Sequence, residues 1–201
     1  LEKLIADGRI HPARIDETVS RVEAEMETTI KEYGDQASFD VGVTDLHPQL
    51  LSLLGKLRFR SVGAQSVLQH SIETANICGM IAGELGINIS MAKRAGLLHN
   101  IGKAVDHDTE GHHAVIAADL CRQYEEEEEI VNAIASQHVE RLKEASILAI
   151  VLSSASTLSA NRPGARKELL TSYIKRLERM EEIILAFPNV KKAYVLQSGR
   201  E

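Results

Sequence analysis

Apolar residues recur three and four positions apart over most of this chain, and this spacing constrains the fold more than any other feature. The apolar residues of 66–85 show this spacing, and so do Ile15, Val19, Val22 and Met26. Such a repeat places side chains on one face of an α-helix. Because aromatic residues make up only 3% of the chain and Trp is absent, the core must be built from Leu, Ile, Val and Ala. The sequence therefore predicts an all-α fold.

Residues that start and stop helices divide this pattern into successive elements. Gly34 is expected to end the first helix, at 13–33, and Gly86 to end the helix at 66–85. Ser90 and Thr109 are expected N-caps. The other helices are expected to open at Pro48 and to cover 91–102, 110–124, 128–139, 144–160 and 166–185, with a loop of weak strand character at 35–45 and a strand at 190–197 that forms a small β appendage near the C-terminus.

Length and charge bound the organisation of the chain. Its 201 residues suit one domain with a small appendage. We expect a lead-in and helix at 1–45, a core domain at 46–165 and a C-terminal helix and strand at 166–201. The net charge of −6 argues against nucleic-acid binding over the whole surface, although it leaves room for a local basic patch. No apolar run approaches the roughly 18–20 residues that a membrane span needs.

Two smaller patterns have an ordinary structural interpretation. Cys78 and Cys121 stand alone within helical patterns, so we expect buried thiols in a protein of a reducing compartment. Five consecutive acids occupy 125–129. They are expected to form a solvated helix N-terminus, where the helix dipole favours negative charge.

Eight histidines are spread over the chain, and several lie in unusual places within predicted helices. They include His70 in LQHSIE, His99 in LLHNIGK, His112 and His113 in EGHH, and His138 in ASQHVE. Imidazole is a good ligand for divalent transition metals. A lone helical histidine is more often an ordinary core or surface group. Spacing alone therefore favours a shared metal site and chance about equally.

Longer motifs decide between these alternatives. LLHNIGK resembles LLHDIGK, the HD motif of the HD metal-dependent phosphohydrolase superfamily, and His70 lies upstream as that pattern requires. Within the superfamily, the chain resembles the ribonuclease Y family from residue 1 to residue 201. The stretches that carry this resemblance are LEKLIADGRIHPARI, LHPQLLSLLGKLRFR, QSVLQHSIETA, KRAGLLHNIGKAVDH, VNAIAS and SANRPGARKE. It implies an HD-type helical bundle.

The resemblance also implies a function. Ribonuclease Y proteins are bacterial endoribonucleases that cleave single-stranded mRNA in RNA turnover. They use a divalent metal (Mn, Mg, Fe or Zn) to activate water and to neutralise the scissile phosphate. The implied partners are RNA, a second copy of the chain in a homodimer, and degradosome-type proteins.

The resemblance further implies that more of the protein precedes this chain. Family members carry a membrane helix, a coiled coil and a KH domain before the HD domain, and they are anchored to the inner membrane with the HD domain on the cytoplasmic side. The chain begins with Leu instead of Met. We expect a fragment that starts just after the KH domain and reaches the membrane only through the N-terminal region.

Carried over residue by residue, the resemblance places the metal ligands at His70, His99, Asn100 and Ser156. Asn100 and Ser156 stand where the family has aspartates. Gln137 stands where the family has the first histidine of a His-His pair, at a second-metal or phosphate position.

The resemblance also implies catalytic and RNA-binding groups. The catalytic groups are His113, His138 and Lys103, which is a candidate phosphate contact. The candidate RNA contacts are Arg162, Arg166 and Lys167. Simpler interpretations stay open: Lys103 as a solvated helix-end cation, and the basic residues as one side of a charged outer helix face.

These replacements remove both anionic metal ligands. An amide oxygen coordinates weakly and a serine hydroxyl poorly, so two imidazoles would leave a +2 charge uncompensated. We therefore expect weak metal binding or none, and weak or lost hydrolysis. Asn100 alone could be an engineered inactivating change, but Gln137 and Ser156 as well favour natural decay. The alternatives are a catalytically silent module for dimerisation, RNA or partner binding, and a nucleotide phosphohydrolase, which the ribonuclease Y-like flanks disfavour.

Overall fold

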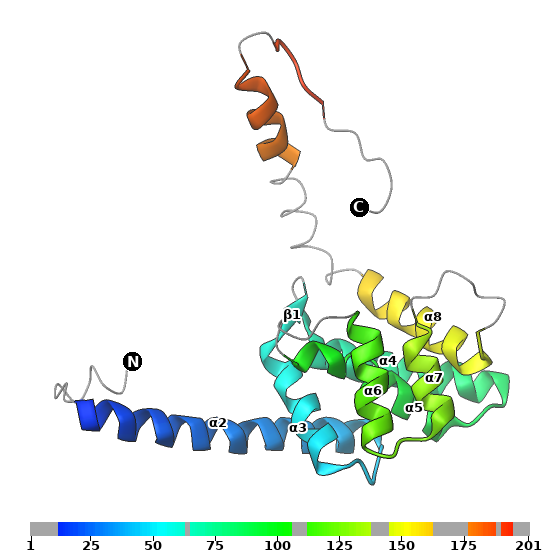
Figure 1. Cartoon of the computed structure of the whole chain (residues 1–201). Helices are drawn as coiled ribbons and strands as arrows, with labels where there is room; N and C mark the ends of the chain where they lie inside the picture. The colour runs from blue at the N-terminus through cyan, green and yellow to red at the C-terminus, as the bar shows by residue number, and fades with distance from the viewer. Residues whose placement is uncertain are drawn as a thin grey trace.

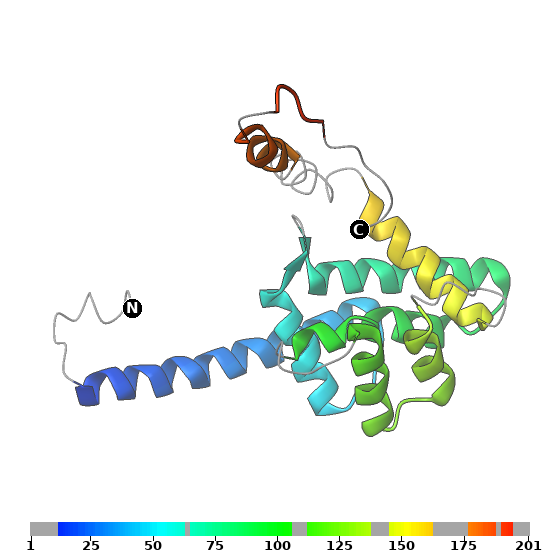
Figure 2. The same cartoon turned by 45° about the horizontal axis from the view of Figure 1, so that its top comes forward.

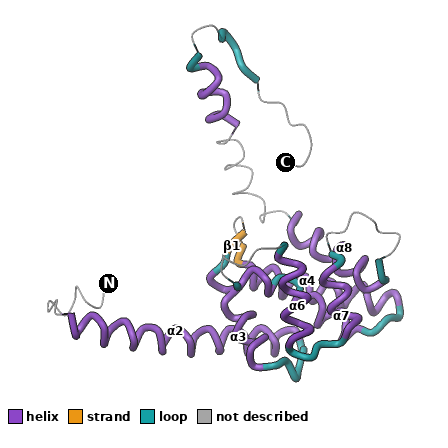
Figure 3. Tube along the Cα trace, in the orientation of Figure 1, coloured by secondary structure: helices purple, strands orange, loops and turns teal. Residues whose placement is uncertain are grey.

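A computed structural model describes residues 12–62, 65–105, 112–137, 145–162, 177–187 and 190–194. Most of these residues are helical (Figures 1 and 3), which confirms the all-α prediction. The helices are α2 (Pro12–Val41), α3 (Pro48–Lys56), α4 (Val67–Leu85), α5 (Ile89–Leu98), α6 (His113–Gln123), α7 (Glu128–Ala135) and α8 (Ile147–Asn161), with the 3-10 helices η1 (Leu57–Phe59) and η2 (Ile101–Ala104). The strands β1 (Ser61–Val62) and β2 (Gln65–Ser66) form a short antiparallel pair.

Helix α4 is central to the bundle because it packs against both α5 and α8. Helix α2 packs on α3, and α6 packs on α7 and η2. Figures 1 and 2 show the N-terminal half of α2 extending well beyond the other helices. The core is aliphatic, as predicted, and its largest fully buried side chains include Leu50, Leu54, Leu97, Leu98, Ile130, Ile134 and Leu152.

The first helix is longer than the sequence predicted, and Gly34 does not end it. Helix α2 continues through 35–41, where a loop was expected, and Gly42, with a φ of +73°, follows its last residue. Gly34 instead lies where α2 meets α3. A Cβ on Gly34 would overlap the carbonyl oxygen of Leu51. The glycine therefore serves close packing of two helices, and the predicted stop was wrong.

Two of the predicted helix starts are also shifted. Gly86 ends α4 as expected, and Ser66 is the N-cap of this helix. The N-cap of α5 is Asn88, whose side chain accepts a hydrogen bond from the Met91 amide, and not Ser90. Helix α6 is capped by His112, not by Thr109, which lies outside the described residues. Asn is as good an N-cap as Ser, so residue preference alone could not choose between 88 and 90.

The acidic run at 125–129 is not fully solvated. Glu126 is only 9% exposed. Its two carboxylate oxygens accept hydrogen bonds from Arg94 Nε at 2.5 Å and Nη2 at 2.8 Å. Arg94 also donates to the carbonyl oxygens of Thr44 and Asp45. Glu126, just before α7, is thus bonded to Arg94 of α5, which in turn is bonded to the loop after α2.

The remaining predictions concern the chain ends and the thiols. Residues 177–185 are helical, in line with the helix expected at 166–185, whereas 163–176 lie outside the described residues. Residues 190–194 have no regular secondary structure, and 195–197 lie outside the described part of the predicted strand. Cys78 and Cys121 are buried free thiols, as expected. In the described part of the chain, no helix combines the length and apolar character of a membrane span.

Candidate metal centre

Helices α4, α5 and α8 bring His70, His99 and Ser156 together. The two imidazole rings lie 5.4 Å apart between centroids, at 71° to each other. Ser156 Oγ lies 3.4 Å from His70 Nε2 and 3.5 Å from His99 Nε2. The Nε2 atoms of residues 29 positions apart therefore face one hydroxyl of a third helix. The sequence predicted this grouping, and the structure shows it.

The His99 ring is held in one tautomer by its own helix. His99 Nδ1 lies 2.7 Å from the carbonyl oxygen of Gly96. Since a carbonyl only accepts, Nδ1 carries the hydrogen and Nε2 is left with a lone pair. Gly96 also brings α5 close to α4, because a Cβ there would lie 2.6 Å from Cα of Ala75. This glycine therefore orients the ring through its carbonyl group and allows α5 to pack closely on α4.

The His70 ring is oriented by a chain of polar groups. His70 Nδ1 lies 2.8 Å from Ser159 Oγ, and Ser159 donates to Glu73 Oε2 at 3.0 Å. Because the serine hydrogen is used on Glu73, its oxygen accepts from His70 Nδ1–H. Glu73 Oε1 pairs with Arg162 Nη2 at 2.7 Å. The Nε2 lone pair of His70 therefore also points toward Ser156.

Asn100 lies beside the two rings. Its side-chain Nδ2 lies 2.8 Å from His99 Nε2, and the residue is 1% exposed. An amide nitrogen can only donate, which agrees with the lone pair assigned to His99 Nε2. The amide thus satisfies the atom that would otherwise be a metal ligand.

Both histidines are held neutral by their surroundings. Burial lowers the pKa of His99 to about 3, with repulsion from His70 as the next cause. Burial also lowers the pKa of His70, followed by repulsion from Lys103 and opposed by Glu73. Lys103 on η2 is itself partly buried, and this burial lowers its pKa. A half-buried cation that acts on both histidines is not the solvated helix-end lysine of the simpler interpretation.

The other predicted site residues fall into two groups. Gln137 is 6% exposed and donates from Nε2 to the carbonyl oxygen of His99 at 3.1 Å. It therefore holds the backbone of His99. His113, the first residue of α6, contributes to lowering the pKa of His99. The predicted residues outside the described part of the chain are His138, Arg166 and Lys167.

The described residues do not provide the donor set of a divalent metal. They contribute two neutral imidazoles, a serine hydroxyl and the Asn100 amide, whose nitrogen faces His99 Nε2. No group of three or more His, Cys, Asp or Glu suited to a metal ion occurs in the described ranges. Glu73, the carboxylate linked to His70 through Ser159, is already paired with Arg162. Nothing here offsets a +2 charge, and Lys103 adds a positive one.

Sequence reasoning missed the two residues that orient His70. Glu73 lies within the quoted stretch QSVLQHSIETA and Ser159 begins the stretch SANRPGARKE, but neither residue was assigned a role, because neither is a ligand in the pattern considered. The signal was present in the spacing, since Glu73 follows His70 by three residues and Ser159 follows Ser156 by three. Residues three apart on a helix share a face.

Comparison with known proteins agrees with this architecture. The HD domain family model matches residues 67–161. Ribonuclease Y of Syntrophobacter fumaroxidans is 58% identical over all 201 residues, which make up 38% of that protein. Ribonuclease Y of Acetivibrio thermocellus and of Lawsonia intracellularis are each 54% identical over the full chain, covering 38% and 39% of their lengths. No solved structure matches the chain.

The segment 67–161 is therefore similar to the HD domain family. Over its full length the chain is similar to the C-terminal part of ribonuclease Y. It spans roughly two fifths of the length of these curated relatives. The matched HD range, 67–161, falls within the core segment expected at 46–165, and the boundaries of that segment stay a prediction.

Proposed function

We propose that this chain is the HD domain of a ribonuclease Y-like protein in which metal-dependent cleavage of single-stranded RNA is weak or lost. The observation that carries the proposal is the contact between Asn100 Nδ2 and His99 Nε2 at 2.8 Å. This amide takes up the lone pair that a metal would need, at the position where the family has a carboxylate. Loss of even an outer-shell partner costs a metal site about 10–100-fold in affinity, so losing two carboxylate ligands costs more.

The test restores both carboxylates and measures cleavage of a single-stranded RNA with Mn²⁺. We expect the parent to stay near the background rate and Asn100→Asp/Ser156→Asp to cleave at least a hundredfold faster. A control pair, Asn132→Asp/Ser154→Asp, adds the same charges at exposed positions of α7 and α8 and should leave the rate unchanged. A parent that cleaves as fast as the restored variant would sink the proposal.

A second candidate function is assembly, and the exposed stripe on α2 favours it. Val19, Val22 and Met26 are 46%, 38% and 43% exposed, although their spacing is that of a helix–helix seam. They lie on the half of α2 that extends beyond the bundle (Figure 1). We propose that this stripe pairs with the same stripe of a second copy, in line with the homodimer that the resemblance implies.

Sedimentation equilibrium tests the dimer directly. The parent should sediment as a dimer and Val22→Glu as a monomer, because a carboxylate in an apolar seam loses its hydration. Glu23→Gln, on the next position of the same helix, is the control and should stay dimeric. A parent that is monomeric at high concentration would exclude this role.

A further inference from the structure

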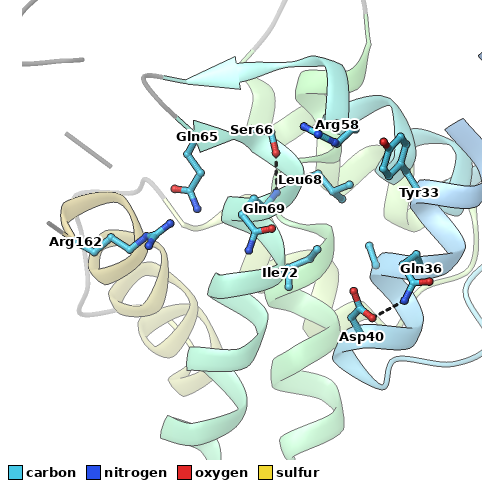
Figure 4. A pocket seen from close by; sticks show the side chains of 11 residues that line it. Tyr33, Gln36, Asp40, Arg58, Gln65, Ser66, Leu68, Gln69, Ile72 and Arg162 are labelled. Atoms are coloured by element: carbon cyan, nitrogen blue, oxygen red, sulfur yellow. Dashed lines mark hydrogen bonds between the residues drawn. The ribbon is translucent and has the colours of Figure 1, made fainter. Parts of the chain in front are cut away.

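A pocket of about 520 Å³ lies between the C-terminal half of α2, η1, the β hairpin and the start of α4 (Figure 4). It extends from Arg162, just after α8, to Tyr33 on α2. Its lining is mainly polar, with amide, hydroxyl and guanidinium groups, and Asp40 is the only acid among the described lining residues. His70, His99, Asn100 and Ser156 of the candidate metal centre are not among the residues that line it.

One end of the pocket is suited to an anion. Arg162 lines it, and α4 begins there with Ser66 as its N-cap. Helix N-termini favour negative charge, and the guanidinium fork matches phosphate geometry. Arg162 uses Nη2 on Glu73, and a guanidinium has five donor hydrogens, so donors remain for a ligand.

A buried donor at the same end has no acceptor. Gln65 Nε2 is buried and makes no hydrogen bond, one of three such side-chain atoms in the described part of the chain. A buried polar group without a partner is costly, about 1–3 kcal/mol. Figure 4 shows Gln65, Gln69 and Arg162 converging where β2, α4 and the end of α8 meet. Because Nε2 has almost no accessible surface, the Gln65 side chain has to turn into the pocket before a ligand oxygen can accept this hydrogen bond.

The other end of the pocket offers groups that recognise a base. Arg58 lies over the Tyr33 ring at 5.4 Å, so an aromatic ring and a guanidinium plane share this wall. Both kinds of surface stack on nucleobases. Gln36 donates to Asp40 at 2.6 Å, which leaves the amide oxygen and the second carboxylate oxygen as acceptors for base amino groups. Leu68 and Ile72 supply an apolar floor.

We propose that this pocket binds a phosphorylated nucleoside, with the phosphate held by Arg162, Gln65 and the start of α4 and the base near Tyr33 and Arg58. The ligand is either a free nucleotide or one nucleotide of an RNA strand. The inference concerns binding alone and does not rest on the proposed function, because it needs neither a metal nor cleavage.

Calorimetric titration in EDTA tests the proposal without any contribution from metal chemistry. The probes are nucleoside monophosphates of all four bases, a short single-stranded RNA and inorganic phosphate. The variants are Arg58→Gln and the isosteric Gln65→Glu, which places a carboxylate where the unpartnered amide was. Arg122→Gln on α6 is the matched control, because Arg122 is also exposed and is not among the residues that line the pocket. Thermal unfolding of each variant verifies that it is folded.

We expect the parent to bind a nucleotide probe and both pocket variants to bind at least tenfold more weakly, with the control unchanged. Binding of the monophosphates identifies a free nucleotide as sufficient, and binding of RNA alone with the same sensitivity identifies a strand as the source. The proposal is overturned if no probe binds, if folded Arg58→Gln and Gln65→Glu bind as the parent does, or if inorganic phosphate binds as tightly as the nucleotides.

Discussion

Two histidine rings at the centre of the molecule are each fixed through Nδ1, one by a backbone carbonyl and one by a serine. The Gly96 carbonyl holds His99, and Ser159, backed by Glu73, holds His70. This arrangement keeps both Nε2 lone pairs directed inward, as a metal site would require. Asn100 donates to His99 Nε2, and Ser156 Oγ lies beside both Nε2 atoms. The imidazoles are therefore oriented as a metal site would require, but the two side chains beside them are uncharged.

Burial of neutral His99 predicts a specific loss of stability in acid. In the unfolded chain a histidine titrates near 6.5, whereas the pKa of folded His99 is about 3. The unfolded state therefore binds a proton that the folded state does not, and stability is lost as pH falls from 6.5 toward 3. Between pH 7 and pH 5 this residue should account for about 2 kcal/mol.

Urea unfolding of the parent and of His99→Gln over that pH range measures this contribution. The variant should be less stable at pH 7 and should lose about 2 kcal/mol less between pH 7 and pH 5. Equal losses in the two proteins would show that His99 is protonated in the folded state.

The buried carboxylate of Glu126 predicts a second effect at the residue scale. Glu126→Gln leaves Arg94 without its charged partner, so we expect a loss of about 2 kcal/mol in the free energy of unfolding. Glu128→Gln, two residues further along the same acidic run, is the comparison. Glu128 is largely exposed and pairs with Arg122 at 3.3 Å, so its loss should stay below about 0.5 kcal/mol. Similar losses of stability for both variants would show that Glu126 is as solvated as Glu128.

At the scale of elements, the sequence predicted what depends on local spacing and missed what depends on contacts between helices. The apolar repeat placed α4 within a residue or two, and Ser66 and Gly86 cap it as their local preferences require. Gly34 was misread because a glycine that stops a helix and a glycine that lets two helices touch are identical in sequence. The burial of Glu126 was missed for the same reason, since Arg94 is 32 positions away.

The candidate centre follows the same division. The histidines and their neutral neighbours were predicted through motif resemblance, which carries information about a shared fold. Glu73 and Ser159 act through hydrogen bonds that join α4 to α8 across 86 positions, and no local pattern encodes such a pair. The sequence could not predict that Val19, Val22 and Met26 on α2 are exposed, because an apolar repeat predicts a buried face without saying what covers it.

The contact between α2 and α3 gives a prediction for whole elements. Gly34→Ala would place a methyl group against the carbonyl oxygen of Leu51, and the backbone of one helix must shift. We expect a loss of about 1–3 kcal/mol. Gly83→Ala in α4 is the control, since its Cβ would only contact Ile89 Cδ1 at 3.6 Å. That variant should be up to about 1 kcal/mol more stable. Chemical denaturation distinguishes the two, and a neutral Gly34→Ala would show that the helices can separate freely.

On the scale of the whole molecule, α4 joins the candidate metal centre to the proposed nucleotide pocket. His70 and Glu73 face the centre, while their neighbours Gln69 and Ile72 line the pocket. Arg162 belongs to both, because it lines the pocket and pairs with Glu73. Arg162 therefore links the proposed ligand pocket to the group that orients His70.

The most direct test of the central claim is the metal content of the purified chain after incubation with Mn²⁺ and removal of free ions. We expect far less than stoichiometric metal in the parent, and stoichiometric metal in Asn100→Asp/Ser156→Asp. Stoichiometric metal in the parent that is lost when His70 and His99 are replaced by alanine would contradict it.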